Sequence, residues 1–111
     1  MNEQRKCRRF ALHLPLRVLR HDDGTISAPG ETVNLGRGGV LFDTDAGMEV
    51  GKPIEYIITL PAGPASLGGV SLRCLGSVLR MEERPPEASS PNRQFAVAAS
   101  VRRYEFVRAD E

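Results

Sequence analysis

Apolar residues recur at every second position along much of the chain, and this alternation constrains the fold more than any other feature. In a β-strand, successive side chains point to opposite faces of the sheet, so an alternating segment forms a strand with one buried face. The first such segment is Phe10–Val18, whose buried face is predicted to hold Leu12, Leu14, Leu16 and Val18. The chain is therefore predicted to be all-β.

Five further segments have strand character and are separated by glycine- and proline-containing turns. They are Glu31–Leu35, Val40–Asp43, Ile54–Leu60, Gly69–Met81 and Phe95–Val101. The fourth is long enough to curve, with a bulge or bend expected at Gly76. Ahead of them, His21–Gly24 is predicted to be a tight turn in which Asp-Gly supplies a positive φ.

A chain of 111 residues is expected to form one domain, here spanning residues 10–111 after a flexible basic segment at residues 1–9. An open sheet of this size leaves two unpaired edges, and closure removes them. The predicted fold is therefore a six-stranded antiparallel β-barrel, with a short helical turn possible over Arg102–Asp110.

Composition limits the classes of function. Fifteen Lys and Arg against 14 Asp and Glu give a net charge of +1, which argues against a nucleic-acid polymer as partner. No apolar run is long enough to insert in a membrane, so a cytoplasmic protein is expected. With two Cys and two His, neither a metal site nor a disulfide is indicated, and Cys74 is expected in the core.

Four positive charges are concentrated in Arg5-Lys6-Cys7-Arg8-Arg9, just before the first predicted strand. An arginine guanidinium can bind a phosphate with two parallel hydrogen bonds, and its planar face can stack on a base. The cluster is therefore a candidate anion site. A solvated basic tail is the alternative interpretation.

The second local concentration is Asn34-Leu35-Gly36-Arg37-Gly38-Gly39, between two predicted strands. A glycine-rich turn exposes backbone N–H groups and lets a ligand approach the main chain, while the Asn34 amide offers both a donor and an acceptor. An ordinary hairpin, in which the glycines only satisfy the geometry of the turn, is the alternative.

Together the two motifs resemble those of the PilZ domain family, the bacterial receptors for cyclic di-GMP. That family carries RxxxR before its first strand, which Arg5–Arg9 matches, and (D/N)xSxxG further on, which Asn34–Gly39 matches. The runs Val70–Val78 and Phe95–Val101 also look like the family. The resemblance implies a six-stranded antiparallel barrel and a role in bacterial signalling.

The resemblance also implies roles for individual residues. Arg5 and Arg9 would hold the phosphates of cyclic di-GMP and stack on guanine, with Arg8 as a further phosphate contact. Asn34 and the turn at Gly39 would shape the other side of the nucleotide site. Ligand-induced ordering of residues 1–9 would then create a surface that an effector protein recognises.

Gly36 departs from the family pattern, which has serine at this position. One hydrogen bond is worth about 0.5–1.5 kcal/mol, so its loss would lower affinity roughly tenfold without abolishing binding. A PilZ-like barrel that has lost nucleotide binding and serves as a protein-interaction or dimerisation module is therefore the second hypothesis. An enzyme is not expected, because the chain offers few nucleophiles and bases and its glycine-rich turn lacks the Lys-Ser/Thr of a P-loop.

Overall fold

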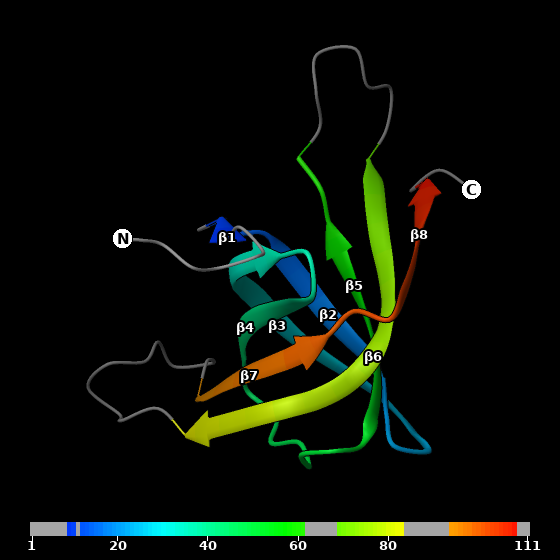
Figure 1. The fold of residues 1–111 in the computed structure, drawn as a ribbon. Coiled ribbons are helices and arrows are strands. Elements are labelled where there is room, and N and C mark those ends of the chain that lie inside the picture. The colour runs from blue at the N-terminus through cyan, green and yellow to red at the C-terminus, as the bar shows by residue number, and fades with distance from the viewer. Residues whose placement is uncertain (1–8, 11, 62–68, 84–93, 109–111) are drawn as a thin grey trace.

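The computed structural model describes residues 9–10, 12–61, 69–83 and 94–108, and all regular structure in these ranges is β (Figure 1). Arg5, Arg8, Cys7 and most of the Pro/Ser-rich loop expected after Glu82 lie outside them. The strands are β1 (Arg9–Phe10), β2 (Pro15–His21), β3 (Gly24–Gly36), β4 (Gly39–Thr44), β5 (Pro53–Thr59), β6 (Val70–Glu83), β7 (Phe95–Ser100) and β8 (Arg103–Arg108).

Six of these strands close into a barrel. The antiparallel order is β3-β2-β5-β6-β7-β4, and β4 pairs with β3 to complete the ring. The prediction of a six-stranded antiparallel barrel is therefore confirmed. Two further strands pair with parts of the barrel strands: β1 pairs with the end of β3, and β8 pairs with the first half of β6.

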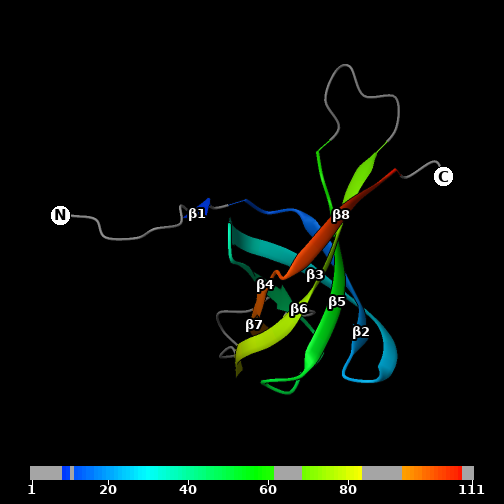
Figure 2. The same cartoon turned by 45° about the vertical axis from the view of Figure 1, so that its right-hand side comes forward.

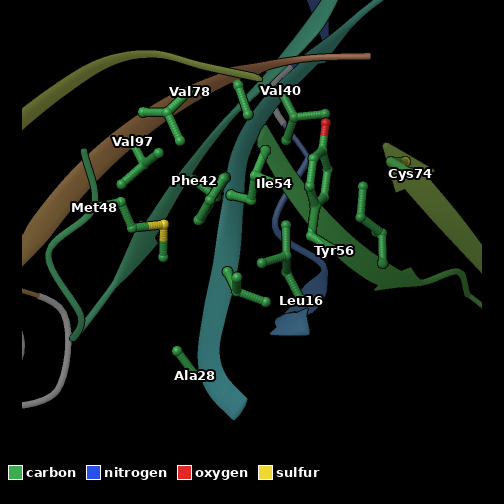
Figure 3. Packing of buried hydrophobic residues seen from close by; sticks show 13 residues of the cluster. Leu16, Ala28, Val40, Phe42, Met48, Ile54, Tyr56, Cys74, Val78 and Val97 are labelled. Atoms are coloured by element: carbon green, nitrogen blue, oxygen red, sulfur yellow. The ribbon is translucent and has the colours of Figure 1, made fainter. Parts of the chain in front are cut away.

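The barrel interior holds the core, and the inward positions of the strands supply it. Phe42 and Tyr56 are fully buried with ring centroids 5.8 Å apart, and Figure 3 shows the buried side chains gathered between the strands. The Tyr56 hydroxyl donates a hydrogen bond to the Ser100 carbonyl oxygen at 3.0 Å, so this buried polar group is satisfied. The buried position expected for Cys74 is confirmed.

Burial of Cys74 leads to a testable pH dependence. Burial raises the pKa of its thiol to about 11, although a hydrogen bond with Tyr56 acts in the opposite direction. Burial also raises the pKa of Tyr56. The unfolded chain releases the thiol proton at lower pH than the folded chain does, so the free energy of unfolding should fall as pH rises from about 9 to about 11.

Urea denaturation followed by circular dichroism across this pH range measures the effect. Cys74→Ala removes one of the two titrating groups and should make the decline with pH shallower. Identical declines in the two proteins would show that the thiol does not couple to folding.

The segment predicted as one strand over Phe10–Val18 is divided, and this corrects the prediction. The Thr32 hydroxyl donates a hydrogen bond to the Leu12 carbonyl oxygen and accepts one from the Leu14 N–H at 2.8 Å. A side chain thus satisfies backbone groups that a neighbouring strand would otherwise pair. Leu12 is consequently 43% exposed rather than buried.

β3 begins seven residues before the predicted start at Glu31 and directly follows the β2–β3 turn. Pro29 and Gly30 concealed this half of the strand, since both residues are unfavourable inside a ladder. In the structure Pro29 still pairs with Arg17, and its carbonyl oxygen accepts a hydrogen bond from the Thr44 hydroxyl at 2.8 Å. The turn is where it was predicted, but its positive φ (61°) falls on Asp22.

β6 is long and curved, as predicted, and carries different partners along its length (Figure 1). One edge pairs with β5, and the other pairs first with β8 and then with β7. The register shift lies between Val78 and Arg80 rather than at Gly76. Gly76 instead lies against Ser100 at the end of β7.

The helical turn considered for Arg102–Asp110 is wrong, because Arg103–Arg108 forms β8. The first half of β6 extends past the end of β7 and has an edge to pair, and β8 occupies it from Leu75↔Arg103 to Val70↔Arg108. Pairing therefore decides the conformation of a segment whose own pattern is ambiguous. Within the described ranges the structure has no helix that would cross a membrane.

Candidate functional site

The β3–β4 hairpin carries the second sequence motif at one end of the barrel. Leu35 pairs with Val40, and Arg37 and Gly38 form the exposed connection. A register shift between Thr32 and Asn34 changes the side-chain alternation just before the turn. Asn34 consequently pairs with Leu41, whose side chain is only partly buried, rather than with a core residue.

A row of cross-strand neighbours extends from Asn34 over four adjacent strands. Asn34 pairs with Leu41, Leu41 with Ala98, and Ala98 with Arg80. Directly paired residues point to the same side of a sheet, so these four side chains share the outer face of the barrel. At about 4.8 Å per strand, the row places the Asn34 and Arg80 backbones roughly 14 Å apart.

This row forms the floor of a groove of about 370 Å³. The small Ala98 side chain leaves room in the middle of the groove, with the half-exposed Leu79 and the exposed Arg80 at one end and the hairpin at the other. Its lining residues are Asn34, Gly36, Gly38, Gly39, Val40, Leu41, Leu79, Arg80, Ala98 and Ala99.

The groove combines three kinds of recognition group. The Asn34 amide has no hydrogen-bond partner among the described residues and is available to a ligand. Arg80 contacts Glu82 at 3.9 Å, but both side chains are more than two-thirds exposed, so this ion pair is weak and the guanidinium can bind an anion. Leu79, 56% exposed, offers an apolar surface to a planar ring.

The first motif reaches the same place through β1. Arg9 pairs with Gly36 and Phe10 pairs with Leu35, so the last arginine of the RxxxR motif lies directly across from the third position of the hairpin motif. Of the residues predicted for the site, Arg9, Asn34, Gly36 and Gly39 are thus brought together in the fold. Arg5 and Arg8 lie outside the described residues.

Gly39 has a structural requirement that is independent of any ligand. It pairs with Ser100, and a Cβ atom at this position would lie 2.8 Å from the carbonyl oxygen of Ala99. Real Cβ contacts are not that short, so only glycine lets β7 approach this closely. The packing of β4 against β7, rather than the geometry of the turn, therefore accounts for Gly39.

Sequence reasoning missed Leu79, Arg80, Leu41 and Ala98 as site residues. Alternation from the buried Val78 would place Leu79 outside the barrel and Arg80 inside it. No local signal indicates the register shift between Val78 and Arg80 that puts Arg80 on the outer face. The pairings β4–β7 and β6–β7 create the groove, and such long-range pairings are not visible in one sequence.

Comparison with protein-family models, with curated proteins and with solved structures finds no match for this chain.

Proposed function

We propose that this protein is a cyclic di-GMP receptor of the PilZ type, acting by binding rather than by catalysis, in the cytoplasm. The pairing of Arg9 with Gly36 is the observation that carries the proposal. Two motifs that are 25 or more residues apart in the sequence and resemble the halves of one nucleotide site meet in a single ladder. If the resemblance of the two motifs to the family were accidental, there would be no reason for the fold to bring them together.

The groove beside this ladder suits the chemistry of a cyclic dinucleotide. Its anionic phosphates require cations: Arg80 lines the groove, and β1 brings the backbone of Arg9 to the hairpin at its other end. Its guanine edges require both donors and acceptors, which the Asn34 amide provides. The contributions of Arg5 and Arg8, and the ordering of residues 1–9 for an effector protein, stay predictions from the sequence.

Titration calorimetry with cyclic di-GMP, with GTP as the control ligand, tests the proposal. The wild-type protein should bind cyclic di-GMP and not GTP, and binding should weaken with salt because exposed phosphate contacts are screened within about 8–10 Å. If neither nucleotide binds, the second hypothesis, a PilZ-like interaction or dimerisation module, replaces the first.

Arg80→Ala should weaken cyclic di-GMP binding about tenfold, because it removes one charge-assisted hydrogen bond. Arg20→Ala is the matched control, since it removes the same charge from a side chain outside this groove. Arg9→Ala should weaken binding at least as much as Arg80→Ala. Equal affinities in the wild type and the Arg80 and Arg9 variants would place the ligand elsewhere.

Gly36→Ser restores the family residue and should tighten cyclic di-GMP binding by about threefold to thirtyfold. Among the described glycines only Gly51 has a positive φ, so serine at position 36 meets no left-handed backbone. The serine hydroxyl can hydrogen-bond the ligand, and the free chain loses conformational entropy. Calorimetry of both proteins measures the change, and an unchanged affinity would mean that position 36 does not face the nucleotide.

A further inference from the structure

A second groove, of about 340 Å³, lies where the β2–β3 turn, the start of β5 and the β7–β8 link meet. Arg20, Arg102 and Arg103 line it. None of these three side chains has a hydrogen bond or ion pair with another described residue. The groove shares no lining residue with the groove at Asn34, so what it binds is a question separate from the nucleotide.

The charge of this second groove is positive. Two carboxylates, Asp22 and Glu55, also line it, but Glu55 is buried and forms an ion pair with Arg73. The positive charge of the three free arginines is therefore balanced only by Asp22. A site of this kind attracts carboxylates or phosphates.

β8 continues directly from the groove, because Arg103 is both a lining residue and the first residue of the strand. Among the described residues β8 pairs only with β6, so its other edge presents unpaired N–H and C=O groups. Figures 1 and 2 show β8 beside the first half of β6, projecting from the barrel. An edge of this kind is a template for another extended chain.

Exposed apolar side chains lie along the same strand. Tyr104 and Phe106 are 64% and 66% exposed, and their rings pack edge to face with centroids 6.1 Å apart. On the opposite face of the sheet, Leu75 is 41% exposed and lines both the arginine groove and an adjoining groove of about 230 Å³. A strand added to the free edge of β8 would be the direct neighbour of Tyr104 and Phe106 and would cover their apolar surface.

We propose that β8 binds an extended acidic segment of a partner protein as an additional strand. The carboxylates of this segment would lie in the groove formed by Arg20, Arg102 and Arg103. Its apolar side chains would alternate with polar ones and cover Tyr104 and Phe106. Backbone hydrogen bonds to the edge would provide affinity, and the arginines would set the specificity for acidic sequences.

A second copy of this chain fits the edge less well than an acidic segment does. Full overlap of two antiparallel β8 strands places Arg103 opposite Arg108 of the second copy. A shift by one residue places Glu105 opposite Glu105 in one direction and Phe106 opposite Phe106 in the other. Like charges directly opposite each other destabilise a ladder. In every register, moreover, β8 of a second copy brings two arginines and one glutamate to a groove that is already positive, so charge complementarity favours an acidic partner.

The probe is a fluorescein-labelled synthetic peptide in which alternating threonine and valine residues are followed by three glutamates. Fluorescence anisotropy measures the binding of this peptide to the full chain. Two N-methylated forms, each methylated at alternate residues, block one or the other edge of the peptide. One form should bind at least about tenfold more weakly than the unmodified peptide, and the other should bind as well as it does. Equal binding of both forms would overturn strand addition.

Protein variants test the position of the site. Arg103→Glu should weaken peptide binding about fivefold to tenfold, whereas Arg80→Glu, with the same change of net charge on the other groove, should leave it unchanged. Phe106→Thr should also weaken it, and this exposed position keeps a β-branched residue in the strand. Equal losses for Arg103→Glu and Arg80→Glu would overturn the site, since they indicate attraction by overall charge.

Analytical ultracentrifugation of the chain without peptide tests whether a second copy of the chain, rather than an acidic segment, occupies the edge of β8. A dimer that Phe106→Thr dissociates would overturn the acidic segment and show that the edge pairs with a second copy. A monomer agrees with the proposal.

Discussion

Replacing Gly76 by alanine is expected to lower the free energy of unfolding by about 3 kcal/mol or more. A Cβ atom at position 76 would overlap the Ser100 carbonyl oxygen and lie only 2.6 Å from the carbonyl carbon. Ser100 is held in place by two hydrogen bonds. Its carbonyl oxygen accepts one from the Tyr56 hydroxyl at 3.0 Å, and its Oγ accepts one from the Ser77 N–H at 2.9 Å. The added methyl group therefore has to displace backbone and break these bonds.

Urea denaturation at neutral pH measures the change, with Gly38→Ala as the control. A Cβ atom at position 38 meets nothing within 4 Å, so the stability of that variant should stay within about 0.5 kcal/mol of the wild type. If the Gly76 and Gly38 variants unfolded at the same urea concentration, the close approach of β6 and β7 would be wrong.

Arg73→Ala is expected to lower the free energy of unfolding by about 2–3 kcal/mol, because it leaves the buried Glu55 carboxylate without its partner. The Arg73 Nε donates to Glu55 Oε2 at 2.5 Å, and the Glu55 side chain is only 7% exposed. Arg73 is itself 47% exposed, so the effect is smaller than for a fully buried pair. Thermal and urea denaturation report the loss.

Two further variants show that the buried charge causes this loss. Adding Glu55→Gln to Arg73→Ala removes that charge and should recover part of the stability. Glu82→Ala breaks the exposed pair between Arg80 and Glu82 and should change stability by less than about 0.5 kcal/mol. A double variant no more stable than Arg73→Ala would mean that Arg73 acts through packing instead.

Much of the fold was predictable because alternation is a local property. The inward positions of β5, with Ile54, Tyr56 and Ile58 buried, follow the predicted pattern directly. The first half of β3 and all of β8 were not predictable in this way. In both cases a pairing partner distant in sequence stabilises a strand whose own residues, such as Pro29, are unfavourable or ambiguous.

The candidate site was predictable only in its motifs. Arg9, Asn34 and Gly36 could be identified from residue type and spacing, and β1 brings them together. Arg80 could not, because its place in the groove depends on a register shift in β6 and on the pairing of Ala98 with both β4 and β6. One-dimensional patterns give the face of a residue but not its neighbours across the sheet.

The position of β7 in the ring has a consequence for synthesis on the ribosome. β7 is the strand that joins β4 to β6, and of the strands in the described ranges it is the last but one in the chain. The barrel of a nascent chain therefore stays open, with β4 and the second half of β6 unpaired along one edge, until residues 95–100 have left the exit tunnel. Non-local pairing of this kind is slow, and the open edges are the stage at which the chain is most exposed to aggregation.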